Sequence, residues 1–417
     1  LGQTCALPIY YFNASAPEQS ATDGRFMSAE ARAARAKVAA VPCTPCWNDW
    51  SVRGGMSYDI FGNGKTALKA SVGKFLAQEA LGFAASVNPL GGQSDSRAWT
   101  DLDKNGTIFD AAGNVQFNEL GASTNSRFGL PAGGTQSDPN IPRSTNWEET
   151  ISVQHELLPR IAVTGGYYHR SFQHIYYTTN TLVNPDTDFT TYTITVPNTP
   201  NLPSGSGQVI TMYNLLPGKL GAVNSVRTWS DRNYRSYNGY EVSVNARLNK
   251  GFLFGGITWD RTETNDCFDL ASSNPNNRRF CNQKPPFKPL YKASASYTLP
   301  WDLQLSGSFQ ARPGIPKGSY YTYNSAVAGV ALTGGGNVTV TVVDPSQNFY
   351  DYVKTNDLRI GRTFRSGRTR FQPFMEVFNV ANLATVLTVN ENIGPNYGDP
   401  GSVTSGRRLQ FGARVDW

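Results

Sequence analysis

The feature that most constrains this chain is a strict alternation of polar and apolar residues along many segments. The clearest segment is GYEVSVNARL, in which the apolar residues fall on one face of a strand: Tyr240, Val242, Val244, Ala246 and Leu248. A period of two predicts β-strands with one apolar and one polar face. By this test the chain contains roughly 12–16 candidate strands. The pattern predicts an all-β, antiparallel fold.

The connections between these segments alternate between very short and very long. Short turns are predicted at Leu158-Pro159, Asn249-Lys250-Gly251, Pro300-Trp301 and Ser366-Gly367. Long connections cover residues 77–146, 178–235, 261–289, 314–354 and 379–406. A compact soluble domain rarely has so many loops longer than about 15 residues, whereas outer-membrane barrels have short periplasmic turns and long extracellular loops. The sequence therefore predicts part of a transmembrane β-barrel.

Composition agrees with strands, rather than helices, crossing a membrane. Charged residues make up 16% of the chain, against about 25% in ordinary domains. No run of about 18 apolar residues exists, which excludes a transmembrane helix. Aromatic residues lie near predicted strand ends, as in the aromatic girdles of barrels: Trp147, Tyr167, Tyr168, Trp259, Tyr291, Tyr297, Trp301 and Trp417. The alternative is a secreted or surface β-sandwich or repeat protein that binds polymers, because a sandwich gives the same alternation.

The last segment, RRLQFGARVDW, alternates up to the final residue. Chain termini usually fray, so an aromatic end needs a reason. We expect this strand to close the barrel against the first strand. Leu409, Phe411 and Trp417 on its apolar face form a candidate signal for the barrel-assembly machinery.

The chain divides into three parts. Residues 1–9 contain QTCALPI, which matches the translation of a common sequencing adapter, so we expect a cloning or assembly scar there. Residues 10–46 are predicted to be an irregular loop segment, with a short Ala-rich helix near residues 28–40. Residues 47–417 are predicted to form the barrel domain. No signal peptide is visible at the start, which fits a mature chain or a missing N-terminus.

Five stretches follow one another in an order that is more specific than any one of them alone: Gly55 to Leu76, Trp99 to Gly129, Asn274 to Gly314, Phe371 to Asn382 and Gly406 to Trp417. Together they resemble the C-terminal barrel of an Oar-like TonB-dependent outer-membrane receptor. Complete members of that family begin with a carboxypeptidase-regulatory-like domain and a plug. The resemblance implies a barrel of about 22 strands, more than the alternation test finds. The chain is therefore expected to be a fragment or a truncated member, without plug or TonB box.

The resemblance implies a bacterial outer-membrane receptor that captures a bulky solute and lets it pass. It implies a TonB-type energy-coupling protein as a partner, besides outer-membrane lipid and lipopolysaccharide. Polar residues expected on the inner face are candidates for lining the path: Glu241, Arg247, Lys292 and Arg414. For each of them the plainer interpretation is simple contact with water in the lumen.

One long loop contains a candidate calcium site. In DLDKNGT, Asp101, Asp103 and Asn105 precede Gly106 at the spacing that opens an EF-hand loop. Position twelve of the loop is Ala112 rather than Glu, so we expect Glu119 to replace it. Calcium is the one cofactor that the sequence suggests. The competing interpretation is an Asx-rich turn without metal.

The cysteines and histidines allow further predictions. Cys267 and Cys281 bracket a 13-residue loop and are predicted to form a disulfide. Cys43 and Cys46 could form a second disulfide or a redox or zinc pair, although no second CxxC completes a zinc site. His155, His169 and His174 could hold a metal, but packing on strand faces is the favoured interpretation.

No catalytic arrangement stands out, so we expect no enzyme. The net charge of +6 raises the possibility of nucleic-acid binding, but basic residues are scattered rather than clustered. The densest run, Arg365 to Arg370, lies beside a short turn. It is interpreted as a solvated hairpin end. The alternative for some basic residues is contact with anionic lipid head groups. We therefore expect no nucleic-acid partner.

Overall fold

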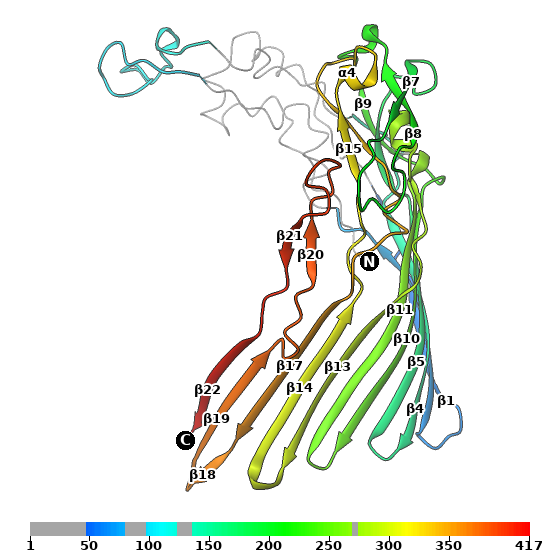
Figure 1. Cartoon of the computed structure of the whole chain (residues 1–417), viewed down its shortest axis with the longest axis vertical. Coiled ribbons are helices and arrows are strands. Elements are labelled where there is room, and N and C mark those ends of the chain that lie inside the picture. The colour runs from blue at the N-terminus through cyan, green and yellow to red at the C-terminus, as the bar shows by residue number, and fades with distance from the viewer. Residues whose placement is uncertain (1–46, 80–96, 123–135, 269–273) are drawn as a thin grey trace.

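The computed structural model describes residues 47–79, 97–122, 136–268 and 274–417. Its main feature is a thirteen-stranded antiparallel sheet, which we call the wall (Figure 1). Apart from the short β12 (Asn282–Gln283) and β18 (Phe364–Ser366), the wall has eleven strands. In order across the sheet they are β1 (Arg53–Asp59), β2 (Thr66–Leu76), β4 (Thr145–Leu158), β5 (Ile161–Gln173), β10 (Tyr234–Leu248), β11 (Gly251–Asn265), β13 (Lys288–Leu299), β14 (Leu303–Arg312), β17 (Val353–Arg362), β19 (Thr369–Phe378) and β22 (Arg408–Asp416). This confirms the all-β, antiparallel fold class.

The predicted short turns join neighbouring strands of the wall. β4 and β5 meet at Pro159-Arg160, and β10 and β11 meet at Asn249-Lys250. β13 and β14 meet at the single-turn 3-10 helix η5 (Pro300–Asp302), in which Trp301 has φ 65°. All these turns lie at one end of the wall, at the bottom of Figure 1. Following the barrel pattern of short periplasmic turns, we call this the periplasmic end.

The opposite, extracellular end carries loops that contain structure of their own. Two hairpins and a short helix form a compact unit that we call the head (Figure 1). Its elements are β7 (Phe189–Thr195), β8 (Val209–Leu215), β15 (Tyr320–Tyr323), β16 (Val338–Thr341) and α4 (Ser325–Ala328). Its core residues include Ile194, Met212 and Val343, each at most 2% exposed. Burial of apolar side chains between two loops therefore orders them as one body.

Smaller elements complete the extracellular end. β9 (Ser225–Trp229) pairs with β6 (Tyr176–Asn180) and, in parallel, with β3 (Gln136–Ser137). β20 (Val386–Val389) and β21 (Pro400–Val403) form a ribbon above β19 and β22 (Figure 1). Three more 3-10 helices are η2 (Phe117–Glu119), η3 (Pro217–Lys219) and η4 (Pro275–Arg278). No helix in the described ranges is long and apolar enough to cross a membrane.

The pairing register divides the wall into an apolar and a polar face. Residues paired across strands share a face, and one such row joins Tyr167, Tyr240 and Trp259 on the apolar side. Many apolar-face side chains are exposed, including Val242 and Phe411. No second sheet covers this face in the described part of the chain. The β-sandwich alternative is therefore wrong, because a sandwich would bury these side chains.

Two expectations need correction. Tyr168 does not join the aromatic row, because its register with Gly239 places it on the polar face. β22 pairs with β19 and not with β1 among the described residues. The expected closure of the last strand against the first is therefore absent. The eleven strands curve through only part of a cylinder (Figure 1), which leaves the two edges apart.

Candidate functional site

The polar face of the wall is hollowed near its extracellular end. A hollow of about 570 Å³ spans β4, β5, β10 and β11, and we call it the tyrosine hollow. Nearly all its lining residues lie on the polar face by register: Glu148, Thr150, Tyr168, His169, Arg170, Phe172, Arg235, Tyr237, Glu241, Thr258 and Thr262. The wall is thus concave on its polar side, which is the side that a barrel turns to its lumen.

Two tyrosine rings cover glycines on the floor of this hollow. A Cβ built on Gly166 would lie 3.1 Å from the ring and hydroxyl oxygen of Tyr168. A Cβ on Gly239 would lie 2.5 Å from the hydroxyl oxygen of Tyr237. Each ring can lie along the wall only because its neighbour two residues away on the same face has no side chain. Tyr168 was expected in the aromatic girdle and Tyr237 was not singled out, although the pairs Gly-x-Tyr and Tyr-x-Gly are visible in the sequence.

The charges around the tyrosine hollow are mostly paired. Glu148 and Arg170 lie opposite each other on β4 and β5 and form an ion pair with a 2.6 Å Oε1–Nη2 distance. Arg235 lies 3.9 Å from Asp266. Glu241 has no hydrogen-bond or ion-pair partner within the described ranges. The hollow therefore offers one free carboxylate among hydroxyl groups and closed ion pairs.

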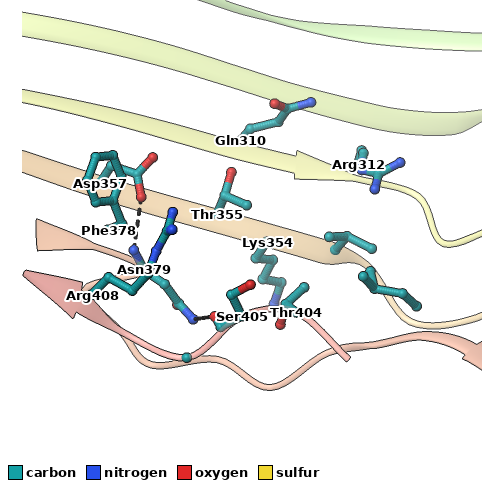
Figure 2. Close-up of a pocket in the computed structure, with 13 residues that line it drawn as sticks. Gln310, Arg312, Lys354, Thr355, Asp357, Phe378, Asn379, Thr404, Ser405 and Arg408 are labelled. Carbon is teal, nitrogen blue, oxygen red and sulfur yellow. Dashed lines mark hydrogen bonds between the residues drawn. The ribbon is translucent and has the colours of Figure 1, made fainter. Parts of the chain in front are cut away.

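A second hollow of about 380 Å³ lies where the ribbon meets the wall (Figure 2). Its inner-face lining includes Gln310, Arg312, Asp357 and Arg408. Asp357 accepts the backbone N–H of Asn379 at 2.9 Å, and the Asn379 amide donates to the Ser405 carbonyl at 2.8 Å (Figure 2). Asn379, at φ 52°, thus fixes the turn that leaves β19. The Asp357 carboxylate therefore stabilises the backbone of this turn.

The predicted inner-face residues all lie on the polar side, but they do not converge. Glu241 lines the tyrosine hollow, whereas Arg247 lies near the periplasmic end of the same strand. Lys292 pairs with Gly256 across β13 and β11. Arg414 donates to Asp416 at 2.9 Å near the end of β22. These four residues mark a polar surface along the wall rather than one binding site.

The segment from Asp101 to Glu119, which we call the acidic loop, brings three of the four predicted calcium ligands together. Carboxylate oxygens of Asp101, Asp103 and Glu119 lie within 4.8 Å of one another. Glu119 is 3% exposed and accepts the backbone N–H of Leu102 at 2.8 Å. Asn105 turns its amide nitrogen, rather than its oxygen, toward Asp103, with a 2.9 Å Nδ2–Oδ2 distance.

Two further features of the acidic loop bear on a cation. Oδ1 of Asp101 is buried and finds no hydrogen-bond partner in the described ranges. The Gln116 amide donates to Asp103 at 2.7 Å and holds the pKa of that carboxyl below its usual value. An orphaned carboxylate oxygen beside two more carboxylates suits a hard cation such as Ca²⁺. The donated hydrogen bonds at Asp103 suit the metal-free Asx turn as well.

The other predicted sites lie apart from both hollows. Cys267 and Cys281 form a disulfide with a Cα–Cα distance of 4.7 Å, beside the short β12. Cys43 and Cys46, the predicted scar and the predicted Ala-rich helix lie outside the described residues. Leu409, Phe411 and Trp417 lie on the apolar face of β22, and Trp417 is 92% exposed.

The three histidines have three separate partners in the described structure. His155 contacts the Thr66 hydroxyl at 2.8 Å, and His169 contacts the Asn238 side chain at 2.9 Å. His174 lies 3.1 Å from the Arg143 carbonyl. A shared metal would need their ring nitrogens to face one point, so this geometry fits the packing interpretation.

The uncovered apolar face and the hollowed polar face define the wall of a transmembrane β-barrel. From Tyr240 to Leu248 the apolar side of β10 extends over nine residues, and the eight steps between them span about 27 Å along the strand. With a tilt of about 40° this spans roughly 21 Å, close to the apolar band of about 25 Å in such barrels. The aromatic row at Tyr240, with rings of Tyr167 and Tyr240 5.0 Å apart, marks its outer border.

The model of the outer membrane beta barrel domain family matches residues 9–342, and the chain belongs to that family. It is an outer-membrane protein of bacteria. No curated protein matches it.

Similar solved structures include the siderophore receptor PirA of Acinetobacter baumannii, with 13% identity and a TM-score of 0.42 over 88% of this chain and 40% of that one. The outer membrane transporter YddB of Escherichia coli has 9% identity and a TM-score of 0.44 over 87% and 39%. The ferripyoverdine receptor of Pseudomonas aeruginosa has 11% identity and a TM-score of 0.40 over 87% and 32%. The chain thus spans two fifths or less of the length of these receptors.

Proposed function

We propose that this chain supplies wall and extracellular capture surface to an Oar-like TonB-dependent receptor that takes up a bulky solute. The observation that carries the proposal is the broad concave polar face, which lies beneath an ordered head. A narrow barrel would fill its interior with its own side chains, whereas this face is hollowed and largely polar. The role is passage and binding rather than catalysis.

We propose further that the wall belongs to a larger barrel. β1 and β22 both run toward the periplasmic end, because neighbouring strands alternate in direction and an odd number of strands, nine, lies between them. Direct closure would pair them in parallel, whereas bacterial barrels are antiparallel with an even strand number. Unpaired edges are also not tolerated in lipid. An odd number of additional strands would satisfy both edges, and eleven more would give the about 22 strands of TonB-dependent receptors.

Energy-coupled uptake can be tested in the source bacterium without knowing the solute. A strain that lacks the gene is grown beside the parent, and the spent media are compared by mass spectrometry. We expect one class of solute to be depleted by the parent alone, and a protonophore to abolish the depletion. Identical media from both strains would contradict a receptor, and depletion that survives the protonophore would contradict TonB-type coupling.

We also propose that the acidic loop binds Ca²⁺, because three carboxylates converge there and Asp101 keeps an orphaned oxygen. Calorimetry on the folded protein should show heat with Ca²⁺, and the double variant Asp101→Ala and Asp103→Ala should show none. Asp110→Ala is the matched control, since Asp110 accepts hydrogen bonds from Asn114 in the same loop. Absence of heat from the unmodified protein would contradict the proposal.

A further inference from the structure

The tyrosine hollow has an aromatic floor on the polar face of the wall. Tyr168 and Tyr237 lie on neighbouring strands, and each ring leans toward the periplasmic end over its glycine. Both rings are half-buried, so neither is packed away in a core. Contact between water and the exposed part of each ring is unfavourable in free energy. A ligand that covers the rings would remove this unfavourable contact.

The groups around this floor suit hydrogen bonding with an uncharged partner. Thr258 and Thr262 lie on β11 with hydroxyls that have no partner within the described ranges. The hydroxyl of Tyr237 faces the Asp260 carboxylate. Glu241, the free carboxylate, is a strong acceptor at the lower border. Donors and acceptors therefore both surround the floor, as an alcohol-rich ligand requires.

We propose that the tyrosine hollow binds a sugar unit of a neutral, polyhydroxylated solute, which deepens the proposed uptake function and rests on it. The C–H face of a pyranose ring stacks on the tyrosines, and its hydroxyls donate to Glu241 and exchange hydrogen bonds with the threonines. The volume of about 570 Å³ lies within the usual range of ligand pockets. The hollow lies at the level of the Tyr240 row, so the sugar would meet it on entering the lumen.

The alternative ligand for aromatic rings beside a carboxylate is an organic cation. The arrangement of the rings favours the sugar, because both rings lie along one surface rather than forming the walls of a cage. Arg170 and Arg235, which line the same hollow, are paired with Glu148 and Asp266.

Neighbouring glycines of β5 and β10 provide the test. Gly239→Ala would place its Cβ 2.5 Å from the Tyr237 hydroxyl and push that ring off the floor. Gly165→Ala adds the same methyl group to the apolar face, where nothing lies within 4 Å. Detergent-extracted protein is titrated by calorimetry with maltohexaose, cellohexaose and xylohexaose, and with choline chloride. Tyr237→Ala is measured in parallel.

We expect at least one oligosaccharide to bind, with about tenfold weaker binding in Gly239→Ala and Tyr237→Ala and unchanged binding in Gly165→Ala. The proposal is overturned if no oligosaccharide binds, if both tyrosine-side variants bind as well as the unmodified protein, or if choline alone binds. Heat-modifiable gel mobility of the same preparation tests the barrel separately. If the protein binds sugar but shows no heat-modifiable mobility, the proposed barrel function is contradicted, whereas the proposed ligand of the tyrosine hollow is still supported.

Discussion

An arginine placed on the apolar face of β10 should destabilise the protein, whereas an arginine at the next position, on the polar face, should not. Val244 lies four residues from both Tyr240 and Leu248 on the apolar face, and thus near the middle of the membrane. Asn245 is its neighbour on the polar face, paired with Phe254. An arginine at the lipid-facing midplane of a barrel costs about 2–4 kcal/mol, whereas one facing the lumen costs little. Val244→Arg should therefore lower the folded-to-unfolded ratio by about 30-fold to 700-fold.

The measurement is urea unfolding of the protein in lipid vesicles, followed by tryptophan fluorescence and by heat-modifiable gel mobility. Asn245→Arg is the matched control, with the same side chain one residue further along the strand. We expect its unfolding midpoint to stay close to that of the unmodified protein. Equal loss in both variants, or no loss in Val244→Arg, would refute the assignment of the apolar face to lipid.

Four further predictions concern other parts of the molecule. Ile194→Ala should destabilise the head by about 2–5 kcal/mol, seen as faster hydrogen exchange in β7 and β8 with wall amides unchanged. Cys281→Ser should speed proteolysis between the former disulfide partners, since closing a loop of about this size is worth about 3 kcal/mol. The pKa of Asp103 is lower in the folded loop than in the unfolded chain. The contribution of its carboxylate to the stability of the loop is therefore complete above pH about 4, and it is lost as the pH falls through the folded pKa. Limited proteolysis of the acidic loop should follow that acid range, and Gln116→Ala should move its onset to higher pH. Deleting Trp417 should reduce the folded fraction in the outer membrane, and normal insertion would contradict an assembly role.

The wall was predictable because its determinants are local. Alternation sets which residues share a face, and short turns such as Asn249-Lys250 fix the register of the next strand. Once one hairpin is in register, each further strand follows from the same two rules. The faces of Glu241 and Lys292 could therefore be assigned from the sequence alone.

The head and the tyrosine hollow were not predictable in the same way. The hydroxyls of Tyr192 and Tyr323 lie 2.7 Å apart although 131 residues separate them in sequence, and nothing local indicates that contact. The hollow depends on Tyr237 meeting the space above Gly239 and on β5 supplying Tyr168 beside it. Such sites arise from the pairing of two strands. The pattern within one strand therefore shows only the residues that this strand supplies, and not those of its partner.

Strands with the same alternation have two different environments in this chain. The difference is whether a second layer of protein packs against their apolar face. Tyr192 and Ile194 on β7 alternate as Val242 and Val244 do on β10. The head residues are buried because a second hairpin, β15 and β16, packs against them. On β10, Val242 is exposed and Val244 is half-buried, because no such layer faces them in the described structure. Periodicity therefore specifies a strand with an apolar face, whereas the partner of that face, protein or lipid, follows from which other segments can reach it. The head hairpins belong to long extracellular loops, which can fold onto each other. The wall strands are joined at the periplasmic end by short turns, and these turns have too few residues to form a layer that covers the apolar face.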